Sequence, residues 1–248
     1  MQFFLGPQVI AVNMLSLAQL KMVVLDRLSA GQGFALATLN LDHLAKLRGD
    51  PAFRHAYAAQ DLITADGNPI VWMARVAGRK LDLLPGSDLI LPLTRLAVQA
   101  GVPVGLIGST SDSLALAAKA LQQAVPGVRI AAKIAPPMGF DPNSTAADTL
   151  LDQLNAAGVR LCFVALGAPK QELFSAAGRL RTPAIGFASI GAGLDFLSGS
   201  QIRAPAWVRR FALEWLWRVM SNPRRMAGRY LRAALILPGH LLASWRQR

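Results

Sequence analysis

The sequence has few of the residues that build disulfides, metal centres and membrane spans. Its one cysteine, Cys162, excludes a disulfide framework and lies in the apolar run "VRLCFVALG", where we expect a buried side chain. Its three histidines, His43, His55 and His240, are scattered and so predict no zinc-type cluster. No apolar run reaches the roughly 18 residues of a membrane-spanning helix, and the N-terminal segment has no basic stretch. We therefore expect neither a transmembrane helix nor a signal peptide.

Short apolar runs alternate with amphipathic stretches over residues 1–202. The apolar runs predict strands at 8–12, 33–39, 62–65, 103–108, 128–134, 159–167 and 183–189. The amphipathic stretches predict helices near 16–29, 42–58, 68–77, 87–100, 111–124, 144–157 and 170–180. Alternating strands and helices indicate βαβ units, and the continuous apolarity of "CFVALG" is typical of strands covered on both faces. We therefore predict an α/β domain over residues 1–202 with a doubly wound, mostly parallel, Rossmann-like sheet.

The formal net charge of +12 is concentrated near the C-terminus. Residues 203–248 hold ten arginines and one acid, which gives this segment +9, and they also hold four of the five tryptophans. This asymmetry indicates a polyanionic partner, either nucleic acid or an anionic membrane surface. Spacing and caps predict one helix over 207–220 and a second after Asn222-Pro223, followed by a run that Pro238-Gly239 interrupts. We predict a basic, Trp-rich helical appendage of the interfacial kind over residues 203–248.

Polar residues stand at the ends of several predicted strands. Asp66-Gly67 follows "LITA", Asn40 follows "ATL" with its Thr38, and Gly108 is followed by Ser109. Because ligands of open α/β sheets bind at the carboxyl ends of the strands, Asp66 is a candidate site residue. The alternative is that Asp66 merely caps the next helix, since Asp is a favoured N-cap.

Two further turns carry candidate binding groups. The turn "GLIGSTSDS" is similar to a phosphate cradle, in which glycine admits the ligand and a helix N-terminus offers N–H groups. It lacks both the dinucleotide glycine fingerprint and the Gly-Lys-Ser/Thr of a P-loop, so an ordinary strand-to-helix turn explains it as well. In "GAPKQE", Pro169 is suited to open a helix. Gln171 and Glu172 would then be first-turn residues, either capping groups or ligands.

Nine segments follow one another along nearly the whole chain: "TLN" (38–40), "ADGNPIVW" (65–72), "GSDL" (86–89), "LIG" (106–108), "GAPKQE" (167–172), "GAGLDFLSG" (191–199), "RAPAWV" (203–208), "LEWLWR" (213–218) and "PRRMAGRY" (223–230). In this order they resemble the WecG/TagA/CpsF family, glycosyltransferase family 26. The resemblance implies an inverting, metal-independent transferase. Such enzymes move a sugar from a UDP-sugar to a polyprenyl-diphosphate-linked saccharide on the inner membrane face, during assembly of bacterial surface polysaccharides or teichoic-acid linkage units.

The resemblance also implies roles for particular residues. Asp66 matches the family's proposed base, a role that a positioned carboxylate can fill. No Asp-x-Asp pair is present to hold a metal, so the leaving diphosphate would be met by basic side chains of the appendage. The substrate-binding candidates in the matched motifs are Thr38, Asn40, Asn68, Ser87, Asp88, Gly108, Gly167, Lys170, Gln171, Glu172, Asp195, Arg203, Arg218, Arg224 and Arg225. Neither a metal nor another cofactor is expected.

One departure from the family pattern bears on the donor sugar. Members often carry an arginine shortly before "GSDL", where this chain reads "LLP" (83–85). Family members use N-acetylmannosamine, N-acetylmannosaminuronic acid or glucose donors, and the departure, with "TLNLDHLAKLR", favours a neutral hexose such as glucose. The N-acetylmannosamine and N-acetylmannosaminuronic acid transferases are the alternatives. We expect a peripheral protein on the cytoplasmic face of the inner membrane, and the sequence leaves a homo-oligomer open.

Two other classes of protein compete with a transferase. Alternating Arg and Trp in the appendage would suit the phosphates and bases of a nucleic acid, but the appendage matches no nucleic-acid motif, so we expect no nucleic-acid partner. A nucleotide-dependent oxidoreductase is disfavoured by the missing glycine fingerprint.

Overall fold

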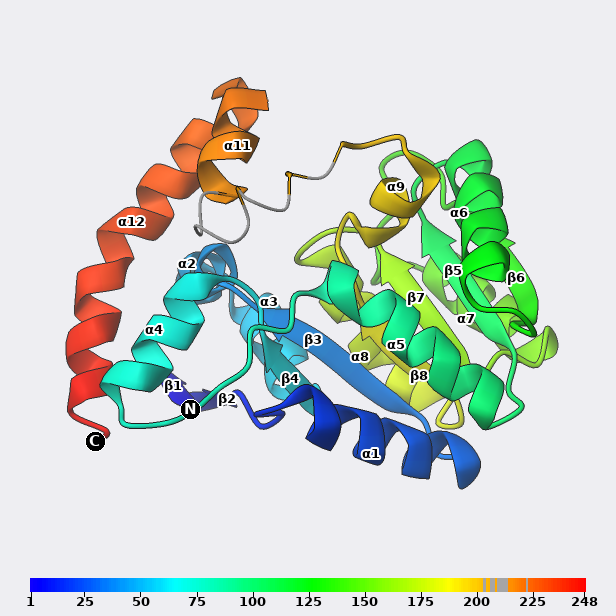
Figure 1. The fold of residues 1–248 in the computed structure, drawn as a ribbon, viewed down its shortest axis with the longest axis horizontal. Coiled ribbons are helices and arrows are strands. Elements are labelled where there is room, and N and C mark those ends of the chain that lie inside the picture. Colours follow the sequence, from blue (N-terminus) through cyan, green and yellow to red (C-terminus); the bar gives the residue numbers. More distant parts are fainter. Residues whose placement is uncertain (203, 206–207, 209–213, 222) are drawn as a thin grey trace.

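The computed structural model describes residues 1–202, 204–205, 208, 214–221 and 223–248 (Figure 1). Its strands are β1 (Gln2–Leu5), β2 (Gln8–Ala11), β3 (Phe34–Leu39), β4 (Leu62–Ala65), β5 (Val104–Gly108), β6 (Ile130–Ile134), β7 (Leu161–Ala165) and β8 (Gly186–Ser189). Its helices are α1 (Leu17–Ser29), α2 (Leu41–Gly49), α3 (Pro51–Ala58), α4 (Asn68–Val76), α5 (Gly86–Gln99), α6 (Ser111–Ala124), α7 (Thr145–Ala156), α8 (Lys170–Arg181), α9 (Gly193–Ser198), α11 (Glu214–Ser221) and α12 (Pro223–Trp245).

Six strands form one sheet in the order β4-β3-β8-β7-β5-β6, and every neighbouring pair is parallel. Alternate residues of each strand face opposite sides of such a sheet. In β3, Leu36 packs into a cluster built with α1, α5 and α6, whereas Ala37 packs with α2, α3 and α4. In β7, Phe163 joins the first cluster and Val164 packs with α7 and α8. Helices therefore cover both faces, which confirms the predicted doubly wound α/β fold (Figure 1).

The strand predicted at 8–12 forms, but outside this sheet. It is β2, which pairs antiparallel with β1 in a separate two-stranded hairpin. Gly6 turns the chain between them with φ +66°, a backbone conformation that glycine adopts readily. Phe3, Leu5 and Ile10 on one side of the hairpin pack with the cluster around α2, α3 and α4. The Gly6-Pro7 pair thus forms the turn of this hairpin.

Three other elements differ from the sequence prediction. The single helix expected near 42–58 is divided into α2 and α3 at Asp50, whose backbone is extended because Pro51 follows it. The Asp50 side chain caps α3 by accepting a hydrogen bond from the amide of Phe53 (2.9 Å). The short helix α9 was not predicted. α12 continues through Pro238, which lies on the exposed side of the helix, where water can solvate a carbonyl that loses its donor.

The C-terminal helix α12 packs along α2 and α4 and is also in contact with α11 (Figure 1). Ala233, His240 and Ser244 are buried on its inner side. The predicted helix at 207–220 is described only from Glu214 onward, and its earlier part falls mostly outside the described residues. Within the described ranges, no helix has both the length and the apolarity to cross a membrane.

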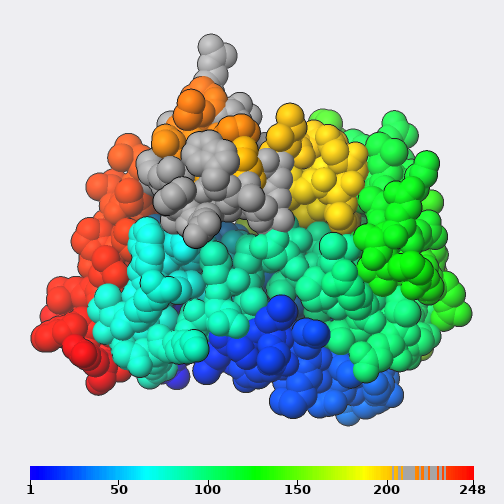
Figure 2. Space-filling model, viewed as in Figure 1, coloured from blue at the N-terminus to red at the C-terminus, as the bar shows by residue number. Residues whose placement is uncertain are grey.

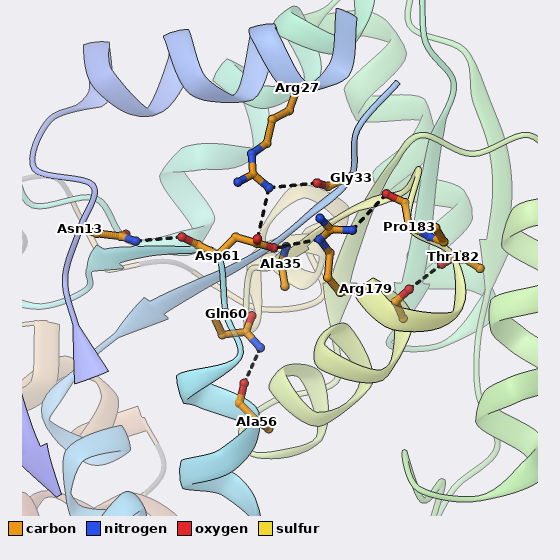
Figure 3. A network of polar contacts seen from close by, with 11 residues as sticks. Asn13, Arg27, Gly33, Ala35, Ala56, Gln60, Asp61, Arg179, Thr182 and Pro183 are labelled. Atoms are coloured by element: carbon orange, nitrogen blue, oxygen red, sulfur yellow. Dashed lines mark hydrogen bonds and ion pairs between the residues drawn. The ribbon is translucent and has the colours of Figure 1, made fainter. Parts of the chain in front are cut away.

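At the amino edge of the sheet, Asp61 joins three elements (Figure 3). Its carboxylate accepts a hydrogen bond from the amide of Ala35 in β3 (2.8 Å) and forms ion pairs with Arg179 of α8 (3.0 Å) and Arg27 of α1 (3.3 Å). Its carbonyl accepts from the side chain of Asn13 (2.8 Å). This network holds helices from both faces of the sheet to the start of β4.

Candidate functional site

The opposite, carboxyl edge of the sheet brings the sequence-predicted residues into one region. Asp66 follows β4, Asn40 follows β3, and their strands are neighbours, with the amide of Asp66 donating to the carbonyl of Leu39 (2.8 Å). Gly167 and Gly191 lie just beyond β7 and β8, the next strands in the sheet. Parallel strands place all these turns at the edge where open α/β sheets bind ligands.

Asp66 does not cap the helix that follows it. The N-cap position of α4 is Gly67, whose φ of +98° suits glycine, and no side chain accepts a hydrogen bond there. The half-buried Asp66 carboxylate instead accepts a hydrogen bond from the Asn40 side-chain amide at 3.4 Å. The oxygen of that amide caps α2 by accepting from the backbone of His43 (2.9 Å). Because the oxygen is held in this way, the Asn40 nitrogen points toward Asp66.

Two residues that the sequence analysis missed lie behind this pair. The ring of His43, which is buried, has one nitrogen 3.5 Å from the Asn40 side-chain nitrogen and the other 3.3 Å from the hydroxyl of Tyr57. Burial, with the nearby charges of Glu172 and Asp66, holds the pKa of Tyr57 well above its usual range, so this hydroxyl stays protonated. The sequence did hold a signal for His43, since it stands three residues after Asn40 and Asn is a favoured N-cap.

Gln171 and Glu172 occupy the first turn of α8, and neither caps it, since Pro169 is at the N-cap position. The Gln171 side chain donates to the Glu172 carboxylate (2.8 Å) and accepts from the amide of Gly191 (3.1 Å), which ties the β7–α8 turn to the β8–α9 turn. Glu172 is fully buried, and its second carboxylate oxygen has no hydrogen-bond partner among the described residues. Burial raises the pKa of Glu172 to about 7, although the Gln171 hydrogen bond and the charge of Lys46 act against that rise.

The two lysines at this edge contact backbone carbonyls. Lys170 donates to the carbonyl of Phe140 (2.6 Å), in the loop before α7. Lys46 donates to the carbonyl of Ala168 (3.2 Å) and pairs with Asp42 (2.9 Å). Both therefore hold loops that border the carboxyl edge.

The turn that is similar to a phosphate cradle holds a carboxylate of the protein. Gly108 has φ +120°, and a Cβ at this position would collide with the carbonyl of Ala165, so the turn needs glycine. Ser109 donates to Asp195 of α9 (2.5 Å), and the other Asp195 oxygen accepts from Gln201 (2.8 Å). A negative charge beside the N-terminus of α6 would repel a phosphate, which favours the ordinary strand-to-helix turn.

The remaining candidates fall into two groups. Thr38 is buried opposite Thr64 in the β3–β4 pair, and Asn68 begins α4. Ser87 lies in the first turn of α5, close to Gly193, where a Cβ would lie 3.3 Å from the Ser87 Cα. These residues, with the exposed Asp88, lie at or near the carboxyl edge. Arg203 is outside the described residues, as are the side chains of Arg218, Arg224 and Arg225, whose backbones belong to α11 and α12. The diphosphate-binding role of these four arginines stays a prediction.

Comparison with known proteins identifies the family of the chain. The profile of the glycosyl transferase WecG/TagA/CpsF family matches residues 7–248. The N-acetylglucosaminyldiphosphoundecaprenol N-acetyl-beta-D-mannosaminyltransferase of Bacillus spizizenii is 28% identical over 200 residues, which cover 80% of this chain and 75% of that protein. The family match extends over both the sheet with its carboxyl-edge residues and the C-terminal helices. The chain therefore belongs to the WecG/TagA/CpsF family of glycosyltransferases.

Proposed function

We propose that this chain transfers N-acetylmannosamine from a UDP-sugar to N-acetylglucosamine linked to a polyprenyl diphosphate. The name of the Bacillus spizizenii relative supplies both sugars and the lipid diphosphate. It favours the N-acetylmannosamine alternative over the glucose donor that the missing arginine before "GSDL" suggested. The same name specifies a β-linked product, which is what inversion at an α-linked nucleotide sugar yields.

The position of Asp66 carries the proposal. A half-buried carboxylate beyond β4, oriented by the Asn40 amide and not used as a helix cap, is suited to act as a general base. Asp66 takes the proton of an acceptor hydroxyl while the hydroxyl oxygen attacks the anomeric carbon from the face opposite the UDP. The new glycosidic bond forms as the bond to the diphosphate oxygen breaks, and the electron pair leaves with UDP.

The developing charge on UDP needs a counterpart. The sequence has no Asp-x-Asp pair, and the appendage has ten arginines, which bind phosphate oxygens in a bidentate fashion. In this proposal, arginines of the appendage stabilise the departing diphosphate, and no divalent metal is required.

An exposed apolar stripe on α12 supports a peripheral position at the membrane. Leu231, Leu235, Leu242 and Trp245 recur at helical spacing and are all at least half exposed. Such a stripe beside a segment with +9 formal charge is typical of interfacial helices. We expect Leu235→Asp/Leu242→Asp to lower co-sedimentation with anionic phospholipid vesicles, whereas Leu116→Asp/Leu180→Asp, at exposed leucines elsewhere, should not. Equal losses in both variants would contradict a membrane role for the stripe.

A donor screen tests the proposed reaction. The full chain is incubated with N-acetylglucosamine on a short-chain polyprenyl diphosphate and, in turn, with UDP-N-acetylmannosamine, UDP-N-acetylmannosaminuronic acid or UDP-glucose, with and without EDTA. We expect UDP release and a β-linked disaccharide with UDP-N-acetylmannosamine alone, at a rate that EDTA leaves unchanged. Faster turnover of UDP-glucose would show that the proposed donor is wrong. A loss of activity in EDTA that Mg²⁺ or Mn²⁺ restores would show that the proposed metal-independent departure of UDP is wrong.

A further inference from the structure

A groove runs along the outer side of α4, next to the candidate base. It has a volume of about 560 Å³ and is lined by residues of α4 and of the loop between α4 and α5. Its lining comprises Asn68, Val71 and Arg75 of α4, and Gly78, Arg79, Lys80, Leu81, Asp82 and Leu83 of the loop. We call it the α4 groove. Its helix residues 68, 71 and 75 follow helical spacing, so they form one continuous wall.

The α4 groove is strongly basic. Arg75, Arg79 and Lys80 are all exposed, and no acid among the described residues forms an ion pair with any of them. One acid, Asp82, also lines the groove, so basic side chains outnumber acids there by three to one. The Asp82 carboxylate accepts a hydrogen bond from the amide of Leu17 (3.2 Å). Unpaired arginines that share a concave surface are suited to bind an anion with several oxygens.

A further basic residue lies close to the α4 groove. The side chain of Arg248 approaches Gly78, where a Cβ would be 3.9 Å from the Arg248 Cγ. In Figure 2 the cyan segment around residues 70–80 lies at the surface of the viewed face, next to the red C-terminal end of the chain.

The margin of the α4 groove is apolar. Trp72 is 42% exposed and Leu83 is 41% exposed. Trp72 stands four residues after Asn68 and three before Arg75, so it borders the same wall of α4. A ligand that fits both the basic lining and this margin is amphiphilic, with an anionic group and an adjoining hydrocarbon chain.

One end of the α4 groove, lined by Asn68 and Leu83, lies close to the candidate base, because Leu83 forms a bridge with Ala65, the residue before Asp66. Asn68 stands two residues after Asp66, and Arg75 is seven residues further along α4, or about 10 Å along the helix axis. A sugar attached to an anion near Arg75 and Arg79 would have to extend along the groove toward Asn68 to reach Asp66.

We propose that the α4 groove binds the diphosphate of the acceptor, with the first isoprenyl units on Trp72 and Leu83. This proposal rests on the proposed function, since it assigns a site to the lipid diphosphate of that reaction. Arg75 and Arg79 hold the diphosphate oxygens, and Lys80 adds a third positive charge. The arginines of the appendage then remain for the diphosphate of UDP.

A second cavity provides a matched control. It has a volume of about 610 Å³ and is also lined by two arginines, Arg129 and Arg160. It opens at the amino edge of the sheet, beside Pro103 and Gly158, and its described lining holds no aromatic side chain. The double variants Arg75→Ala/Arg79→Ala and Arg129→Ala/Arg160→Ala remove equal charge from cavities of similar size.

Steady-state kinetics of the full chain form the first test, with the short-chain polyprenyl-diphosphate acceptor and the UDP-sugar varied in turn. In Arg75→Ala/Arg79→Ala we expect the acceptor KM to rise at least about tenfold, or about 1.4 kcal/mol. The donor KM and kcat should stay within about twofold, and Arg129→Ala/Arg160→Ala should match the wild type. A rise in the donor KM instead, or the same rise in both double variants, would overturn the assignment. If an alanine variant unfolds, Arg75→Gln/Arg79→Gln takes its place.

Calorimetric binding of farnesyl diphosphate, inorganic diphosphate and UDP forms the second test and needs no turnover. Arg75→Ala/Arg79→Ala should weaken farnesyl diphosphate and inorganic diphosphate about tenfold or more and leave UDP unchanged. Trp72→Ala should weaken farnesyl diphosphate but not inorganic diphosphate. Unchanged binding of farnesyl diphosphate in either variant would overturn the lipid assignment. If this pattern holds while the wild type transfers no sugar, the proposed function fails and the α4 groove stands.

Discussion

The two ends of β4 carry the same side chain in two different environments. Asp61, just before the strand, accepts from one backbone amide and pairs with two arginines at 3.0–3.3 Å. Asp66, just after the strand, is held by a neutral amide at 3.4 Å. Asp61 is paired with basic side chains and stabilises the fold, whereas Asp66 lies at the edge where substrates of such sheets bind. The surroundings of a carboxylate, more than its residue type, thus decide whether it stabilises the fold or takes part in a reaction.

Removing the charge at the carboxyl edge should have the largest effect. In Asp66→Asn the base is lost, so kcat should fall by about 10²–10⁴-fold. The midpoint of thermal unfolding should stay near the wild-type value, since Asp66 caps no helix. Turnover measured by UDP release and unfolding followed by circular dichroism test both expectations. A variant with half the wild-type rate would remove Asp66 from the role of base.

A third carboxylate, Glu172, sharpens the comparison because it is buried without a balancing ion pair among the described residues. Burial raises its pKa from 4.5 to about 7. Below pH 4.5 the group is protonated in both folded and unfolded chains. Between these two pH values the unfolded chain has lost the proton while the folded chain keeps it, so the free energy of unfolding falls as the pH rises. Above pH 7 the full loss is about 3 kcal/mol.

Glu172→Gln cannot ionise and keeps an oxygen for the Gln171 amide. We therefore expect the variant to gain stability relative to wild type as the pH rises from 4.5 to 8. Urea unfolding at several pH values measures this difference. A difference that does not change with pH would contradict a neutral, buried Glu172.

The amino edge should show the smallest of the three effects, and on stability alone. In Asp61→Asn the two arginines lose their partner, and we expect the free energy of unfolding to fall by about 2 kcal/mol. The kcat of the folded fraction should be unchanged, because the Asp61 network (Figure 3) precedes β4 at the amino edge of the sheet, whereas Asp66 follows β4 at the carboxyl edge. A large fall in kcat with normal stability would reverse the roles that we assign to the two ends of β4.

Much of the fold could be predicted from the sequence because its signals are local. Apolar runs such as Leu161–Ala165 are buried on both faces, and their alternation with amphipathic helices predicts a parallel sheet. The hairpin was missed because β1 and β2 have only four residues each and their exposed positions include the apolar Phe4 and Val9, so the sequence does not show the period of two that is typical of a half-buried strand.

The candidate site could be predicted only in part. A polar residue directly after an apolar run, as at Asp66, marks the carboxyl edge from sequence alone. Tyr57 could not be found in this way, because its contact with His43 depends on how α2 and α3 pack. The role of Asp195 also required the structure, since its partner Ser109 is 86 residues away.

The sequence by itself determined the α/β class, the polar strand ends and the basic C-terminal segment, because each follows from side chains that are neighbours in the chain. Only the tertiary structure decided which of these residues meet. β8 inserts between β3 and β7, so turns that are distant in sequence share one edge. Asp61 and Asp66 are alike in sequence context, and only packing brings two arginines to one and the Asn40 amide to the other. Electrostatic roles depend on distances in space, which the order of residues does not contain.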